Sequence, residues 1–176
     1  HPGMPKSTDK HPAETSTEII ENILSVLKRH KLTRVYGFMN GITTKYMEER
    51  YKILKMWKEA GHLIGNHTYD HLDYLDVTPE KFIQDIEDNE SIMLDYVDSI
   101  EELKHFRFPF LQEGNTKDKR YAVRNYLFRR NYKIAEVTVD FEDWIFAPSY
   151  MRCVLQRNLI GMRKLEKIYM EYAEKR

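Results

Sequence analysis

Two histidines close in sequence are the residues best suited to carry chemistry. His67 and His71 follow a short apolar stretch that ends in Gly65 and Asn66, residues that favour a tight turn at a strand end. Imidazole is the commonest protein ligand for transition metals, and zinc suits it well. At this spacing the two rings converge on one ion if the segment is helical. A catalytic zinc site needs three protein ligands, so the pair predicts two of them; the alternative is a solvated or capping role.

Two further predicted strand ends carry polar candidates. Arg107 lies near Pro109, where a strand must end or bulge because proline cannot donate to a central ladder. Asp140, Asp143 and Trp144 follow a strongly β-branched stretch. Each has a simpler interpretation: a surface charge for Arg107, a helix N-cap for Asp140 and a core filler for Trp144. Their recurrence at the same end of successive strands favours a functional role.

The elements that would position these residues alternate along the chain. Apolar periodicity predicts helices over 16–30, 45–60, from 79 to about 97, 117–131 and, as one or two elements, 150–174. Apolar or β-branched runs predict strands over 35–39, 105–111 and 134–140, besides the one before His67. Strict alternation indicates parallel strands with helical crossovers, an α/β fold. In such folds functional groups gather at the carboxyl ends of the strands.

Local signals mark several helix ends. Thr15 and Glu18 form the pattern of a capping box at the first helix. Gly61 is expected to end the second helix, and Thr78 with Pro79 to begin the third. These signals support the predicted boundaries independently of the apolar pattern.

Composition limits the function classes. The 176 residues suit one domain over 1–176, with 1–14 as a loop or tail. The 28 basic and 28 acidic residues cancel, which argues against a nucleic-acid partner held by bulk charge. No apolar run reaches the length of a membrane span. The single Cys153 excludes an internal disulfide and is interpreted as a buried small residue; His62, at a strand start, is assigned a structural role.

Three segments together resemble one known family. Residues 61–71, read as Gly-His-x-Ile-Gly-Asn-His-Thr-x-x-His, are similar to the metal-binding motif of the polysaccharide deacetylases, the NodB-homology carbohydrate esterases. Residues 107–110 resemble that family's Arg-x-Pro motif, and residues 140–144 resemble its Asp-x-x-Asp-Trp motif. The segments occur in the family's order, over roughly residues 16–150.

The resemblance implies a distorted (β/α) barrel of the polysaccharide deacetylase type, here incomplete at both ends. It implies a metal-dependent hydrolase that removes acetyl groups from acetylated carbohydrate, such as N-acetylglucosamine polymers or oligomers. His67 and His71 would hold a divalent metal, most commonly zinc. Arg107 would hold the catalytic carboxylate, and Asp140 with Trp144 would belong to the wall that orients the general acid.

The same resemblance implies a substrate groove and a place of action. Its substrate-binding candidates are Tyr69, Pro109, Phe110, Asp143 and Trp144. The partner would be an acetylated oligo- or polysaccharide, and the protein would be periplasmic or secreted.

The chain departs from the family at two motifs. It contains no Asp-Asp pair, which would supply the general base and the third metal ligand, and no late Leu-x-His, which would supply the general acid. An incomplete copy of an enzyme, which we favour, and a degenerate member that binds without hydrolysis both explain this. Asp9 and Asp70 are the candidate substitute ligands, but Asp70 is expected to point away from the face that the histidines share.

Two other functions stay open. One is a non-catalytic carbohydrate-binding relative that uses Tyr69 and Trp144 as stacking surfaces. The other is a hydrolase of a non-sugar amide or imide, since Phe110 stands where many sugar deacetylases have glycine. A bulky ring there is expected to narrow the groove and favour short substrates.

Overall fold

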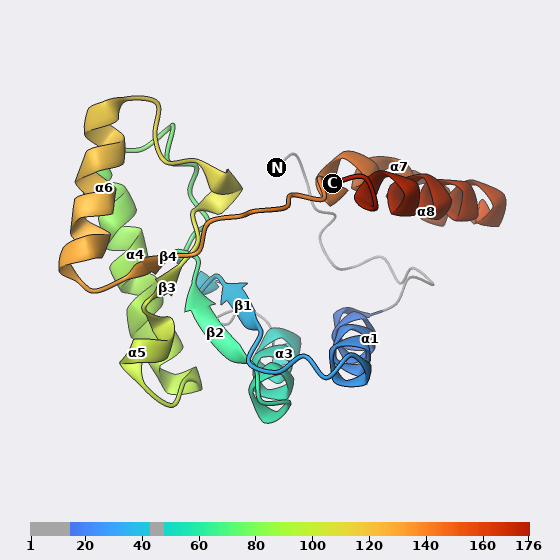
Figure 1. Ribbon diagram of the computed structural model, residues 1–176, viewed down its shortest axis with the longest axis horizontal. Coiled ribbons are helices and arrows are strands. Elements are labelled where there is room, and N and C mark those ends of the chain that lie inside the picture. The colour runs from blue at the N-terminus through green and yellow to red at the C-terminus, as the bar shows by residue number, and fades with distance from the viewer. Residues whose placement is uncertain (1–14, 43–47) are drawn as a thin grey trace. The chain divides into compact units, whose positions relative to one another are not determined.

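A computed structural model of the protein describes residues 15–42 and 48–176 (Figure 1). These residues form two compact units, Thr15–Glu136 and Val137–Arg176, each of which is described by itself. The single domain expected over 1–176 remains a prediction, because compact units need not fold independently. The tail expected over 1–14 lies outside the described residues.

The larger unit is built on a parallel sheet of four strands. They are β1 (Tyr36–Met39), β2 (Leu63–Asn66), β3 (His105–Phe106) and β4 (Lys133–Ile134). Their order in the sheet follows their order in the chain, and all three pairings are parallel. Asn66 pairs with Phe106, so β2 and β3 end side by side. The predicted α/β fold with parallel strands is confirmed.

Helices connect the strands and are capped as their sequences predict. They are α1 (Ser16–Arg29), α3 (Glu48–Glu59), α4 (Pro79–Met93), α5 (Ile100–Leu103) and α6 (Lys117–Arg129). Both hydrogen bonds of the Thr15–Glu18 capping box are present, and Thr78 accepts from the Lys81 amide. Gly61 has a φ of 81°, a left-handed conformation that favours glycine at a helix end.

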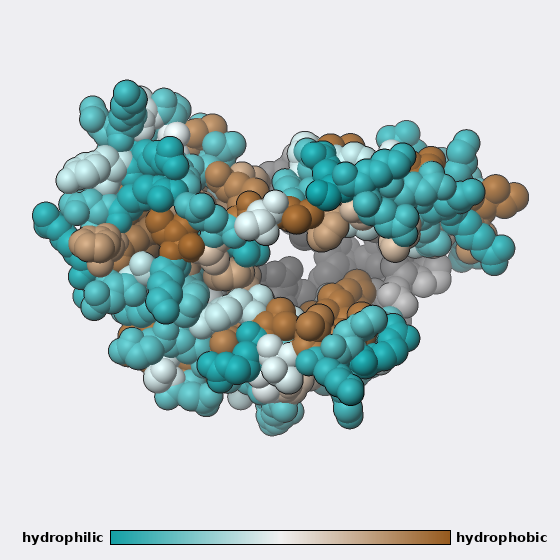
Figure 2. All heavy atoms as spheres, in the orientation of Figure 1, coloured by the Kyte–Doolittle hydropathy of each residue, from teal (hydrophilic) through white to brown (hydrophobic). Residues whose placement is uncertain are grey.

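Two apolar clusters hold the helices to the sheet. One gathers Phe82 and Ile86 of α4 with Val123 and Leu127 of α6 around Phe106. The other gathers residues of α3, α5 and the end of α4 around Ile64 of β2: Leu54, Trp57, Met93 and Leu103. In Figure 2 the visible surface over α6 is mostly hydrophilic, as expected for a helix that buries one face.

Two predicted strands are much shorter than expected. The strand predicted over 105–111 ends at Phe106, and Pro109–Leu111 forms the 3-10 turn η2. The strand predicted over 134–140 ends at Ile134. β4 pairs only with the two-residue β3, so its β-branched continuation has no ladder partner among the described residues. Pairing, not propensity, sets the length of both strands.

The smaller unit is a helical hairpin. It contains α7 (Asp143–Leu155) and α8 (Leu159–Ala173), and Phe146 packs its ring against Tyr169 and Tyr172. The expected start at residue 150 is wrong, because α7 begins at Asp143 and runs through Pro148. In the described part of the chain no helix combines the length and apolar character needed to cross a bilayer.

Candidate metal and catalytic site

The two histidines of the predicted metal pair lie together at the carboxyl end of β2. Their ring centroids are 4.8 Å apart and the rings meet edge to face. The segment is not helical, contrary to the condition set for convergence: Thr68 and His71 have φ values of 63° and 55°, in the left-handed region. Convergence therefore comes from a loop that turns twice through a conformation uncommon for these residue types.

His67 is fixed by the end of the neighbouring strand. Its Nδ1 lies 2.7 Å from the main-chain oxygen of Arg107, an acceptor, so Nδ1 carries the proton and donates. Nε2 is left with its lone pair, which is the arrangement of a metal-binding imidazole whose other nitrogen is held by a carbonyl. The Arg107 amide in turn donates to the Asn66 carbonyl at 3.1 Å, so one residue of β3's end holds both Asn66 and His67.

Burial keeps both imidazoles neutral. It lowers the pKa of His67 to about 4, against the opposing effect of its hydrogen bond to Arg107, while the charges of His71 and Arg107 lower it further. Burial also lowers the pKa of His71. Neutral imidazole is the metal-binding form, so the pair is ready to bind without losing a proton near neutral pH.

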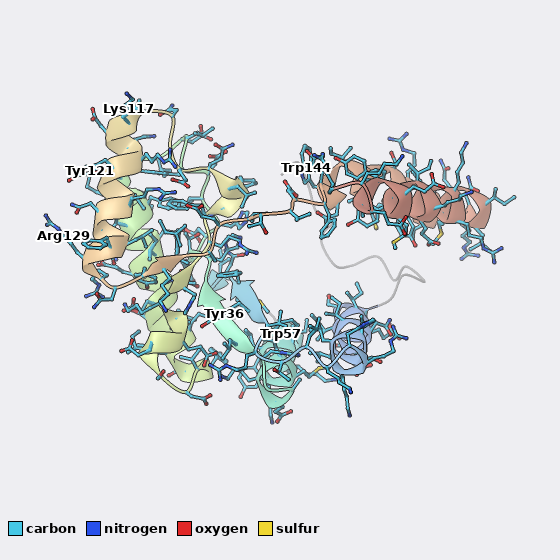
Figure 3. All side chains as sticks on the ribbon, viewed as in Figure 1. Tyr36, Trp57, Lys117, Tyr121, Arg129 and Trp144 are labelled. Atoms are coloured by element: carbon cyan, nitrogen blue, oxygen red, sulfur yellow. The ribbon has the colours of Figure 1, made fainter. Side chains whose placement is uncertain are left out.

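Arg107 lies on an aromatic platform. Its guanidinium carbon is 4.2 Å from the ring centroid of Phe38, and its Nε donates to the Ala135 carbonyl at 3.2 Å. Gly65 makes room for this platform, since a Cβ there would lie 2.5 Å from the Phe38 ring. The same aromatic row continues through Tyr36, labelled in Figure 3, whose hydroxyl lies 2.8 Å from His105 Nδ1. Burial lowers the pKa of Arg107 without bringing it near neutrality.

The residues after Arg107 border the histidines. Pro109 is buried, and Phe110, 38% exposed, places its ring 4.6 Å from that of His71. Tyr69 is half-buried: its ring lies against Gly41, where a Cβ would approach it to 2.6 Å. Phe110 therefore contacts His71 directly, whereas Tyr69 packs against the backbone at Gly41.

A buried polar network, which sequence reasoning missed, supports the loop. Asn66 is fully buried; its Nδ2 donates to the Ile86 carbonyl and the Tyr132 hydroxyl, and its Oδ1 accepts from the Thr68 amide and from Asn89. Every hydrogen-bonding position of this amide group is used, so Asn66 fixes the start of the loop rigidly.

α4 holds the same loop from the side. The buried carboxylate of Asp85 accepts from the Asp70 amide at 3.1 Å, and its carbonyl accepts from Tyr69. Burial raises the pKa of Asp85, against the hydrogen bonds that lower it. Asp85 and Asn89 lie four residues apart on the apolar face of α4. Polar residues at this helical spacing among apolar ones are the sequence signal that could have predicted a buried polar network.

The predicted third motif belongs to the smaller unit. Asp140 Oδ1 accepts from the Glu142 amide at 2.9 Å, Asp143 is the first residue of α7, and Trp144, labelled in Figure 3, is 59% exposed. Trp144 is thus neither the end of a strand nor a core filler within its own unit. The roles of Asp140, Asp143 and Trp144 remain predictions.

The donor set fits part of a metal site. Two neutral imidazoles converge, and one has its second nitrogen fixed by a carbonyl. Over residues 15–42 and 48–176 no three His, Cys, Asp or Glu side chains cluster as a ligand set. Asp70 is exposed, as expected for a side chain that leaves the shared face, and Asp9 lies outside the described residues. The assignment of His67 and His71 as two metal ligands therefore remains a prediction.

Comparison with known proteins identifies the family. The polysaccharide deacetylase family model matches residues 8–130 of the chain. A curated relative, the peptidoglycan-N-acetylmuramic acid deacetylase PdaA of Bacillus subtilis (strain 168), is 32% identical over 63 residues, which span 36% of this chain and 22% of PdaA.

Solved structures show the same fold. A family 4 carbohydrate esterase from Streptomyces lividans, solved with acetate, has a TM-score of 0.57 at 17% identity, over 82% of this chain and 67% of its own. The chitin deacetylase of Colletotrichum lindemuthianum has a TM-score of 0.56 at 21% identity, over 75% and 54%. A family 4 pseudoenzyme from Bacillus anthracis has a TM-score of 0.59 at 19% identity, over 85% and 48%. Because the family model covers more than half of the sequence, the chain belongs to the polysaccharide deacetylase family.

Proposed function

We propose that this chain carries part of the active site of a metal-dependent hydrolase that removes acetyl groups from acetylated carbohydrate. The observation that carries the proposal is the hydrogen bond between His67 Nδ1 and the Arg107 carbonyl, which joins the metal-binding motif to the Arg-x-Pro motif. Membership of the family supports the reaction class. The chain spans 22% of its curated relative and 48–67% of the compared structures, so the activity belongs to the whole protein.

The reaction is amide or ester hydrolysis. Water adds to the acetyl carbonyl, the bond to the sugar nitrogen or oxygen breaks, and acetate and a free amine or hydroxyl leave. A divalent metal, for which zinc suits the imidazole donors, supplies carbonyl polarisation and a more acidic water. His67 and His71 would hold that ion.

The other residues orient the reacting groups. Arg107 would hold a carboxylate through its guanidinium, which Phe38 and the Ala135 carbonyl keep in place. Phe110 and Pro109 would form one wall of the acetyl-binding end, and Tyr69, Asp143 and Trp144 would contact the sugar. Asp140 would act with Trp144 in orienting the general acid.

The substrate would be a polymer outside the cytoplasm. PdaA is named for peptidoglycan and the Colletotrichum enzyme for chitin, so we propose an acetylated cell-wall glycan and a periplasmic or secreted location.

A binding role without turnover is the second candidate. The exposed rings of Trp144 and Phe110, 59% and 38% exposed, favour it, because aromatic faces stack on sugars. A third candidate is hydrolysis of a compact non-sugar amide, favoured by the contact between Phe110 and His71.

One experiment separates these functions. The whole protein that contains this chain, loaded with zinc, is incubated with an N-acetylated chito-oligosaccharide, with peptidoglycan and with a formamide, and released acetate or formate is measured. An Arg107→Ala variant is the matched control. Acetate release that the variant loses supports the deacetylase; oligosaccharide binding without release supports the binder; neither binding nor release overturns the proposal.

A further inference from the structure

The turn that carries Phe110 has a backbone conformation that its own residues do not favour. Phe110 and Leu111 both lie in the left-handed region, with φ values of 54° and 57°, which is uncommon for bulky side chains. Two backbone hydrogen bonds close the turn, accepted by the carbonyls of Phe108 and Pro109. Such a turn persists only where the surrounding structure holds it. The groups that hold it therefore help to determine where the Phe110 ring lies.

Glu113 ties the end of this turn to α6. Its carboxylate accepts two parallel hydrogen bonds from Arg124, Nε to Oε2 at 2.5 Å and Nη2 to Oε1 at 2.7 Å, and a third from Arg120 Nε at 2.8 Å. The side chains of Glu113 and Arg124 are 21% and 32% exposed, so water screens this pair less than a surface ion pair. A two-pronged contact between guanidinium and carboxylate fixes direction as well as distance. The Glu113–Arg124 clamp therefore anchors the chain three residues after Phe110.

The same helix holds the segment that follows His71. Tyr74 is fully buried, and its hydroxyl donates to the Lys119 carbonyl at 2.6 Å. Lys119 Nζ in turn donates to two carbonyls of that segment, at 3.1 Å and 3.0 Å. One helix thus holds both segments whose rings meet, since the Phe110 ring lies 4.6 Å from that of His71.

We propose that Arg124 is a positioning residue that keeps the Phe110 ring beside His71 and so limits the length of substrate that the site accepts. The inference rests on the proposed function, because the substrate is the acetylated glycan named there. Arg124 acts through Glu113 and the turn, not on the substrate itself. Without the clamp the turn would be free to leave its left-handed conformation, and the ring would no longer narrow the groove.

Substrate length gives the first measurement. Arg124→Gln and Glu113→Gln each remove the charge pair while leaving a long polar side chain. In the whole protein that contains this chain, each should raise kcat/KM for a long chito-oligosaccharide relative to the monomer by up to about fivefold. The zinc Kd should stay unchanged, whereas general loosening of the fold would weaken zinc binding and lower activity on both sugars. In a Phe110→Gly background neither substitution should change the ratio further, because the ring on which the clamp acts is gone.

Two further arginine variants serve as controls. Arg129→Gln removes the same charge from an exposed residue at the end of α6, labelled in Figure 3, and should leave the ratio unchanged. Arg124→Lys keeps the charge but loses the two-pronged geometry, and should give an intermediate ratio. If Arg124→Gln shows the same ratio as Arg129→Gln and the unsubstituted protein, the proposal is overturned.

The ring contact can be measured without turnover. With isotope-labelled histidine and phenylalanine, nuclear Overhauser contacts between the rings of Phe110 and His71 should be present in the unsubstituted protein and in Arg129→Gln, and weakened in Arg124→Gln. An unchanged ring contact in Arg124→Gln overturns the clamp, whatever the activity. Absence of acetate release from the unsubstituted protein overturns the proposed function instead, and the ring contact still decides whether Arg124 positions Phe110.

Discussion

The Nδ1–H of His67 donates to the main-chain carbonyl of Arg107 across 2.7 Å, and the Arg107 amide donates to the Asn66 carbonyl. One residue at the end of β3 thus holds both the last residue of β2 and the first imidazole of the predicted metal pair. Because this bond fixes the tautomer of His67, the Nε2 lone pair faces away from the Arg107 carbonyl and remains for a ligand.

Zinc affinity is the first test of this arrangement. His67→Ala and His71→Ala should each weaken zinc binding by at least about tenfold, because each removes one of two converging imidazoles. Competition with a chromophoric chelator measures the Kd. His30→Ala removes an exposed histidine at the end of α1 and is the matched control. Equal Kd values for all three variants would contradict the assignment.

Asn66 should matter for stability as much as for the site. Asn66→Ala leaves the Ile86 carbonyl, the Tyr132 hydroxyl and the Asn89 amide group without their buried partner. We expect a loss of about 2–4 kcal/mol in the free energy of unfolding, measured by urea denaturation. Gln84→Ala, which removes one exposed hydrogen bond to Asp88 on α4, should cost less than about 0.5 kcal/mol. If Asn66→Ala lowers the free energy of unfolding as little as Gln84→Ala does, the network does not hold the loop rigidly.

Glu90 makes the free energy of unfolding depend on pH. Burial alone would raise its pKa, but hydrogen bonds from Lys104 and Tyr132 and the charges of Lys104 and Arg130 outweigh burial, so the folded-state pKa lies below the unfolded value. The stabilisation is therefore present above the unfolded pKa and is lost as pH falls through the folded pKa.

Glu90→Gln measures this contribution directly. The variant should be less stable by about 2 kcal/mol at pH 7, and the difference from the parent chain should shrink as pH falls below about 4. Urea denaturation across this pH range is the measurement. Glu59→Gln, at an exposed ion pair with Lys55, is the control and should show little pH-dependent difference. If the free energy of unfolding of Glu90→Gln differs from that of the parent chain by the same amount at every pH, the effect comes from packing and not from the charge of Glu90.

Phe110 should set substrate length. Phe110→Gly removes the ring beside His71 and is expected to raise acetate release from a long chito-oligosaccharide relative to the monomer by about tenfold or less. Leu111→Gly is a close control, because both residues have left-handed φ values, 54° and 57°, and both are exposed. Titration with the same sugars gives a second measurement. If the unsubstituted whole protein already prefers the long substrate, the Phe110 ring does not narrow the groove.

The sequence determined the order of the elements and predicted which two histidines lie together at the end of β2. Helix periodicity, the Thr15 and Thr78 caps and the left-handed Gly61 are local properties, fixed within a few residues, and the structure confirms each. The family motif identified His67 and His71 because residue type and spacing are properties of the sequence alone.

Tertiary structure decided what depends on a partner elsewhere. The lengths of β3 and β4 follow from pairing, so β-branched residues after Ile134 do not extend the strand. The histidines converge through a left-handed loop that Asn66 and Asp85 hold with hydrogen bonds 15 or more residues apart in sequence. Such bonds form only after β2 and α4 have packed, because a buried polar group pairs with whatever the fold brings within reach. Local pattern therefore predicts which residues do chemistry, and only packing fixes how they face one another.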